Sequence, residues 1–134
     1  MQVPFGLFLV CHGLVHAIYV GHARRLFEVR SGVVWPDGSW ALSRTLGDPA
    51  ARWFVAVTFS LVAAAFTVAA IALVLRQPWW APLAGSAAAV SALALLLAWD
   101  GRLHDSAVQG AYAVVLDVVI AVFAVVVSWP HIDA

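Results

Sequence analysis

Residues 53–75 read WFVAVTFSLVAAAFTVAAIALVL and contain no charged side chain. About 20 mostly apolar residues are enough for a helix to cross the hydrocarbon of a bilayer. The apolar run is continuous and does not alternate, which favours a helix over a β-strand. Lipid also requires every backbone polar group to be paired within the structure. The stretch therefore predicts a membrane-spanning helix at about residues 50–75.

Similar runs without charge occur in the rest of the chain. Residues 1–23 contain no Arg, Lys, Asp or Glu, and 23 uncharged residues separate Arg76 from Asp100. Between Ser106 and Ile132 the only formal charge is Asp117. These runs predict three more helices, at about residues 3–22, 82–99 and 109–129.

The composition agrees with a membrane protein of a single domain, residues 1–134. Apolar residues make up 64% of the chain, charged residues 10%, and the mean hydropathy is +0.96. A soluble domain carries about 25% charged residues, so an ordinary soluble fold and a disordered chain are excluded. Seven arginines balance seven acids, so no net charge points to nucleic acid. The expected partner is the lipid bilayer, and the expected fold is an all-α, four-transmembrane-helix antiparallel bundle.

The arginines predict the orientation of this bundle. Five of them lie between the end of the first helix and the start of the second: Arg24, Arg25, Arg30, Arg44 and Arg52. Arg102 follows the third helix, whereas the opposite side has only Arg76. By the positive-inside rule, both termini are extracytoplasmic, and loops one and three face the cytoplasm of a bacterial inner membrane.

The first loop, about residues 23–48, is the only long one. It contains Trp35-Pro36-Asp37-Gly38, a combination typical of a turn. The segment after this turn has Trp, Leu and Arg side chains that suit the membrane interface. We expect a short interfacial helix there, at about residues 40–46.

Small residues recur at helical spacing in the apolar runs. In the fourth helix they form one face with Asp117: Gly110, Ala113, Ala121, Ala124 and Ser128. The third helix has a similar stripe, Ala84, Ala88 and Ser91, and Gly13 lies on one in the first. Small residues let membrane helices approach closely, so these faces are expected to pack and Asp117 to point into the bundle.

Asp117 is the polar residue that most needs a partner. An ionised, unpaired carboxylate in a membrane helix costs about 2.5–3.5 kcal/mol on insertion scales. His12 and His16 are four residues apart on one face of the first helix. Counted from the cytoplasmic helix ends, His16 lies about 9 Å deep and Asp117 about 10 Å deep, so His16 is expected level with Asp117 and His12 one turn deeper. Further polar residues that could surround this site are Tyr19, His22, Asp100 and His104.

The cluster allows several interpretations. A His–Asp pair can tie two helices by a hydrogen bond, or it can carry protons. His12, His16 and Asp117 could also be the ligands of a divalent metal ion, since two histidines at i and i+4 share a face. Haem would need two axial ligands at matching depth, for which only His16 and His104 qualify. No cofactor is expected in the first interpretation, and a divalent metal ion is the alternative.

Short motifs give the chain a resemblance to a known group. His12-Gly13-Leu14-Val15-His16 lies early in the first helix, Trp40-Ala41-Leu42-Ser43-Arg44 precedes the second, and Trp79-Trp80 and Trp99-Asp100 flank the third. In these motifs the chain resembles small uncharacterised four-helix bacterial membrane proteins with an HGLIH-like first helix. It is similar to DoxX-like proteins in architecture only. The resemblance implies a four-helix bundle and no established activity, and it carries no role over to Asp117.

The leading functional hypothesis is a non-enzymatic accessory subunit of a larger membrane complex, or a subunit that self-associates into a homo-oligomer. One alternative is proton-coupled or small-molecule transport, for which four helices per chain would require an oligomer. The other is metal or cofactor binding through the histidines and the aspartate in the membrane. No phosphate loop, dinucleotide motif or Ser/His/Asp set occurs in the sequence.

Overall fold

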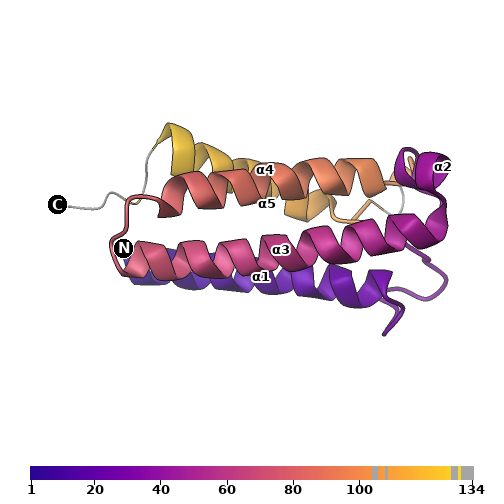
Figure 1. Cartoon of the computed structure of the whole chain (residues 1–134), viewed down its shortest axis with the longest axis horizontal. Helices are drawn as coiled ribbons and strands as arrows, with labels where there is room; N and C mark the ends of the chain where they lie inside the picture. Colours follow the sequence, from indigo (N-terminus) through magenta and orange to yellow (C-terminus); the bar gives the residue numbers. More distant parts are fainter. Residues whose placement is uncertain (104–105, 108, 128–129, 131–134) are drawn as a thin grey trace.

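The computed structural model describes residues 1–103, 106–107, 109–127 and 130. The regular secondary structure of the described residues is all helical and includes no strand, so the predicted all-α class is confirmed. Its elements are α1 (Gln2–Ala23), α2 (Leu42–Leu46), α3 (Asp48–Val74), α4 (Trp80–Ala98), α5 (Ala111–Ala121) and the π-helical segment η2 (Val122–Val126), most of which are labelled in Figure 1.

Three helices, α1, α3 and α4, are long and apolar enough to cross a membrane. Each of their ends lies within two residues of the end predicted from the uncharged runs. The fourth apolar helix is shorter than predicted, because α5 and η2 together cover only Ala111–Val126. Residues 128 and 129, the end of the predicted helix, lie outside the described residues.

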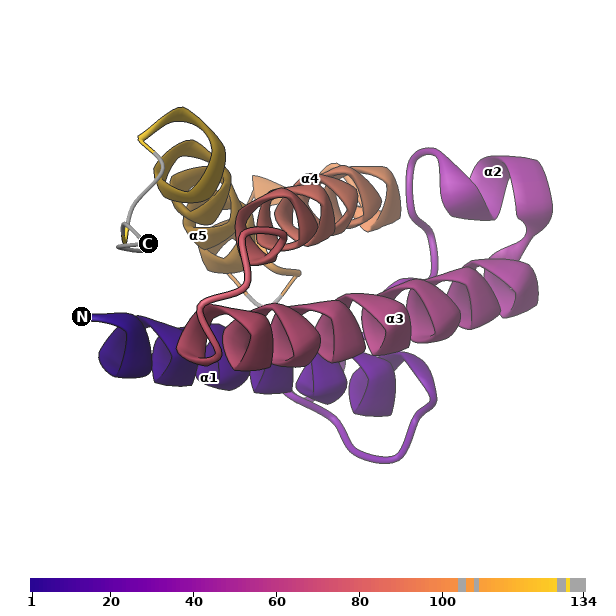
Figure 2. The ribbon, with the colours of Figure 1, turned by 60° about the vertical axis from the view of Figure 1, so that its left-hand side comes forward.

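Apart from the short α2, successive helices pack side by side and run in opposite directions: α1 against α3, α3 against α4, and α4 against α5 (Figures 1 and 2). Two glycines allow close packing between neighbouring helices, and one of them, Gly13, lies in a stripe predicted to do so. A Cβ atom added at Gly13 of α1 would lie 3.2 Å from the backbone oxygen of Ala63 in α3. Gly85 of α4 lies directly against Val125 of η2. Bulkier side chains at these two glycines would push the helices apart.

The first loop folds over one end of the helices. It crosses the start of α3 to reach α2, which lies beside the end of α4 (Figure 1). Asp37 in the loop accepts hydrogen bonds from Arg25 at 2.6 Å and from Arg52 at 2.9 Å. Trp35 is 2% exposed and packs on the ring of Tyr19. The loop is therefore fastened to the helices and covers their ends.

The short helix after the turn begins later than predicted, at Leu42 instead of residue 40. Trp40 instead joins the loop to α4: its backbone N–H donates to the Trp99 carbonyl at 2.8 Å, and its indole N–H donates to the Leu96 carbonyl at 2.7 Å. These two bonds fix Trp40 against the neighbouring helix, so the helical turn starts only after it.

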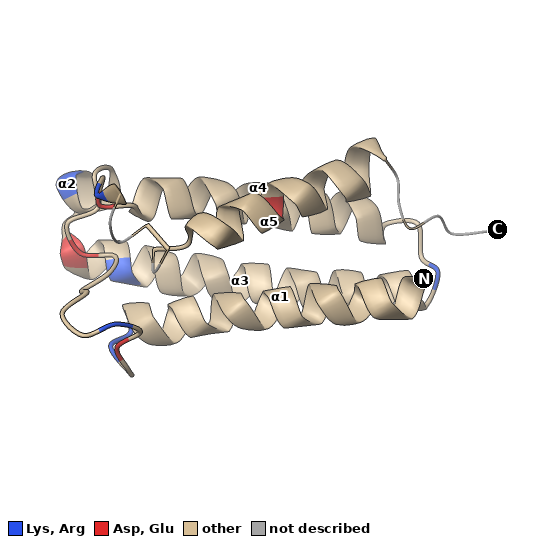
Figure 3. Ribbon diagram, turned by 180° about the vertical axis from the view of Figure 1, so that it is seen from behind, with Lys and Arg blue, Asp and Glu red and all other residues tan. Residues whose placement is uncertain are grey.

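Charged residues gather at the α2 end of the molecule, with Arg76 at the opposite end (Figure 3). The acidic residue that Figure 3 shows halfway along the helices is Asp117 of α5. Its side chain is 0% exposed. The expectation that Asp117 points into the protein is therefore met, and its partners define the site described next.

Candidate functional site

Asp117 is joined directly to His12. The two residues lie on α5 and α1, 105 residues apart in the chain, and the His12 Nε2–Asp117 Oδ1 distance is 2.7 Å. An ionised carboxylate can only accept, so the His12 Nε2–H donates in this bond. The His12 side chain is 1% exposed and that of Asp117 is 0% exposed. A charge-assisted bond in so dry a place links two helices that are distant in the sequence.

His16 is held one helical turn further along α1. Its Nδ1–H donates to the His12 backbone carbonyl at 2.9 Å, because a carbonyl only accepts. With the proton on Nδ1, the neutral ring presents a lone pair on Nε2, to which the Ser91 hydroxyl of α4 donates at 2.6 Å. The same Nε2 lies 4.0 Å from Asp117 Oδ2. Three helices therefore meet at these four side chains.

The sequence placed His16 level with Asp117 and His12 one turn deeper, but in the structure His12 bonds the carboxylate directly and His16 Nε2 lies 4.0 Å from its other oxygen. The prediction placed the ends of the first and fourth helices at the same depth. In the structure, α5 starts further inside: a Cβ at Gly110 would lie 3.3 Å from the Tyr19 hydroxyl. Tyr19 and Gly110 are each seven residues, or about 10 Å, from His12 and Asp117 respectively, so the antiparallel helices bring these two level.

Aromatic rings enclose the two imidazoles. The Phe66 ring centroid lies 5.0 Å from that of His12 and 5.6 Å from that of His16. Phe59 lies 5.4 Å from His16, and Phe8 stacks on His12 at 6.1 Å. Phe59 and Phe66 are themselves fully buried. These rings exclude water from the polar groups and lower the local dielectric, which strengthens each electrostatic contact.

Two buried polar atoms of the site have no hydrogen-bond partner among the described residues: His12 Nδ1 and Asp117 Oδ2. A buried polar atom left unpaired costs about 1–3 kcal/mol. Asp117 Oδ2 faces the Nε2 of His16, but 4.0 Å is too long for a hydrogen bond. The side of the carboxylate that faces His16 therefore offers an oxygen for another interaction.

His12, His16 and Asp117 each present one potential ligand atom, and these three atoms lie within 4.8 Å of one another. Around a tetrahedral zinc ion, ligand atoms at 2.0–2.1 Å from the metal are about 3.4 Å apart. Small side-chain movements would bring the present spacing to that value. The Nδ1–H bond of His16 to a carbonyl is also the contact that orients most metal-bound histidines. The donor set therefore fits a divalent transition metal.

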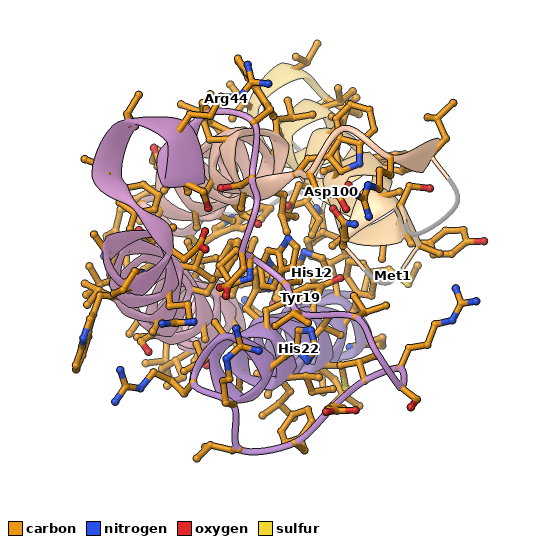
Figure 4. The ribbon with its side chains drawn as sticks, turned by 90° about the vertical axis from the view of Figure 1, so that its right-hand side faces the viewer. Met1, His12, Tyr19, His22, Arg44 and Asp100 are labelled. Atoms are coloured by element: carbon orange, nitrogen blue, oxygen red, sulfur yellow. The ribbon has the colours of Figure 1, made fainter. Side chains whose placement is uncertain are left out.

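The other predicted polar residues lie at different distances from this cluster (Figure 4). Tyr19 adjoins it, with its ring 6.2 Å from that of His16. His22 stacks on Trp35 nearer the end of α1. Asp100 follows the end of α4, where its backbone N–H donates to the Gln109 side chain at 3.0 Å. His104 lies outside the described residues, so the haem ligation predicted for His16 and His104 lies outside them too.

Ser91 is the member of this cluster that the sequence did not reveal. In the sequence it belongs to a stripe of small residues in the third predicted helix, now α4, where a serine packs like an alanine. In the structure it is fully buried and bonded to His16. The only signal in the sequence is a hydroxyl among alanines, and serine is common on such faces for packing alone.

The arrangement thus supplies two imidazoles, a carboxylate and a hydroxyl from three helices, enclosed by phenylalanine rings. It can neutralise the carboxylate, bind a cation and fix the helices relative to one another. No protein-family model, curated protein or solved structure matches this chain, so what the site does is argued from its own geometry.

Proposed function

We propose that this chain is a small multi-pass membrane protein that binds one divalent transition-metal ion through His12, His16 and Asp117. The single observation that carries the proposal is the convergence of these three ligand atoms within 4.8 Å in a buried site. Two imidazoles and one carboxylate suit Zn²⁺ and neighbouring first-row ions. In the metal-free protein the Ser91 hydroxyl occupies the lone pair of His16 Nε2, and it would release that lone pair when the ion binds.

A helix-to-helix tie alone accounts for less of the geometry. The bond between His12 and Asp117 would be sufficient for such a tie. It leaves Asp117 Oδ2 buried without a hydrogen-bond partner, 4.0 Å from the Nε2 of His16. A cation between Oδ2 and the two imidazoles would give that oxygen a partner and balance the negative charge.

In this proposal the ion joins α1 to α5, and the protein is a non-enzymatic accessory or self-associating subunit. The close backbone packing runs α1–α3–α4–α5, so side chains of the cluster connect the first member of this series to the last. We also propose that α5 and η2 complete a fourth span, that both termini are extracytoplasmic, and that loops one and three face the cytoplasm. The arginine distribution supports this orientation.

The test is metal binding by the full-length protein purified in a mild detergent. After equilibration with Zn²⁺ and removal of free ion, elemental analysis is expected to find one zinc per chain. Co²⁺ in place of Zn²⁺ is expected to give visible absorption bands of a low-coordinate nitrogen and oxygen site. Asp117→Asn and His16→Gln should abolish both signals. His22→Gln, which removes a histidine outside the cluster, should leave them unchanged.

Zinc contents equal in wild type and Asp117→Asn would overturn the proposal, as would a wild-type protein that retains no ion. Circular dichroism on each variant shows whether it still folds. Asp117→Asn suits this purpose, because the amide oxygen still accepts a hydrogen bond from His12 while the charge is lost.

A further inference from the structure

Two adjoining pockets lie on the outer face of α1 and α3, near the charged end of the molecule. The first, about 320 Å³, is lined by Ala23, Arg24, Arg25, Pro49, Arg52 and Trp53. The second, about 330 Å³, is lined mainly by apolar side chains: Val20, Arg24, Trp53, Ala56, Val57, Ser60 and Leu61. Arg24 and Trp53 line both, so a basic pocket continues into an apolar groove along the helices.

The basic pocket carries an excess of positive charge. Three arginines line it and no acid does. Asp37, which lines a different pocket, bonds Arg25 and Arg52 from the side. Even with Asp48 counted as a second neighbouring acid, three positive charges face two negative ones. Asp37 holds the two guanidinium groups in place, and their remaining N–H groups can still donate to an anion.

Arg24 and Trp53 mark the boundary between the two pockets. The guanidinium carbon of Arg24 lies 3.9 Å from the centroid of a Trp53 ring, a cation–π contact. Trp53 is 57% exposed, and tryptophan prefers the depth of the lipid headgroups. Arg24 therefore lies at the level where the phosphate of a lipid lies.

The apolar groove continues from this level toward the middle of the membrane. Along α3 it runs from Trp53 through Val57 to Leu61, which are spaced four residues apart on one face. Val57 is 53% exposed and Leu61 is 66% exposed. Eight residues of helix cover about 12 Å, most of the roughly 15 Å of one leaflet. The groove thus has the position and direction of an acyl chain.

We infer that these two pockets form a binding site for one anionic phospholipid, with its phosphate among Arg24, Arg25 and Arg52 and an acyl chain along α1 and α3. Basic pockets between membrane helices are suited to anionic headgroups. Charge complementarity selects the anionic lipid, and the apolar groove selects a lipid over a free phosphate ion. The site is independent of the metal cluster, which uses other residues.

The test is native mass spectrometry of the full-length protein in neutral detergent, with dioleoyl phosphatidylglycerol or dioleoyl phosphatidylcholine added at equal concentration. Wild type is expected to retain one phosphatidylglycerol molecule in clear preference to phosphatidylcholine. Arg24→Gln should weaken phosphatidylglycerol binding about tenfold, as expected for one lost bond to a charged group. Arg44→Gln removes the same charge from the exposed surface of α2, outside both pockets, and should have no effect.

Two further measurements test separately the contribution of the lipid acyl chain and that of its phosphate. Val57→Gln places a polar amide in the groove and should weaken lipid binding although every arginine is intact. Millimolar inorganic phosphate should fail to displace the lipid. Equal retention of the two lipids by wild type, equal losses in Arg24→Gln and Arg44→Gln, or displacement by inorganic phosphate would each overturn the inference.

Discussion

At the scale of single residues, Asp117 has one carboxylate oxygen bonded to His12 and the other 4.0 Å from His16. Both oxygens are enclosed, so every change at this position alters the pairing of buried groups. Side-chain hydrogen bonds between membrane helices contribute about 0.6 kcal/mol on average and at most about 1.7 kcal/mol. A charged bond between two helices belongs at the upper end of that range.

Asp117→Ala is therefore expected to lower the free energy of unfolding of the metal-free protein by about 1–2 kcal/mol. Thermal or denaturant unfolding in detergent, followed by circular dichroism, measures the change. Tyr112→Phe serves as the control, because the Tyr112 side chain is 73% exposed on the same helix. Equal stabilities of Asp117→Ala and wild type would contradict a bonding role for the carboxylate.

Ser91→Ala separates the support of His16 from metal binding. The change leaves His16 Nε2 without its 2.6 Å partner, so a loss of about 1 kcal/mol in unfolding free energy is expected. Zinc binding should persist, because Ser91 is not among the three proposed ligands. Ser60→Ala makes the same chemical change at an exposed position of α3 and should leave stability unaltered. Loss of zinc binding in Ser91→Ala would instead show that the Ser91 hydroxyl is a metal ligand.

At the scale of the helices, Gly13 lets α1 pack closely against the backbone of α3. A Cβ there meets the Ala63 carbonyl oxygen at 3.2 Å and the Phe66 Cβ at 3.4 Å. These are backbone and backbone-proximal atoms, so they cannot move aside as the end of a long side chain would. The phenylalanine that encloses both histidines is thus fixed by the same contact.

Gly13→Leu is expected to separate α1 from α3 and to destabilise the protein by about 1–3 kcal/mol. It should also weaken zinc binding, since Phe66 and His12 would shift with the helices. Cys11→Leu adds bulk at an exposed position of α1 and provides the matched control. Unfolding curves and zinc content of the two variants test this prediction, which fails if both behave like wild type.

The sequence predicts α1, α3 and α4 well because charge marks where each apolar run stops, and the bilayer demands such runs. It does not predict which histidine meets Asp117. That register depends on how deep α5 begins, and so on how Gly110 packs beside Tyr19 and Leu95. The π-helical segment η2 also escapes the pattern, because its valines read as an ordinary apolar helix. Uncharged runs set the length of a helix, whereas packing sets its depth.

At the scale of the whole molecule, the charged loops and α2 lie at one end, and Arg76 lies at the other (Figure 3). The loop is fastened there by Asp37 to both α1 and α3. If this end faces the cytoplasm, the first loop is accessible only from inside the cell.

Cysteine labelling in cells tests this orientation. In a Cys11→Ser background, Arg44→Cys and Gln77→Cys place one thiol at each end of the molecule. A membrane-impermeant maleimide is expected to label Gln77→Cys in intact spheroplasts, and Arg44→Cys only after lysis. The reverse labelling pattern would show that the protein has the opposite orientation and would contradict the proposal.

The bond between His12 and Asp117 spans 105 residues, which has a consequence for biosynthesis. At a translation rate of about 5–20 residues per second, about 5–20 s pass between synthesis of the histidine and of the aspartate. During that time α1 carries only imidazoles, which can stay neutral in lipid. The carboxylate, the group with the largest insertion cost, is synthesised last, when its partner is already present. Because His12 precedes Asp117 in the chain, the nascent protein never carries the Asp117 carboxylate without its partner.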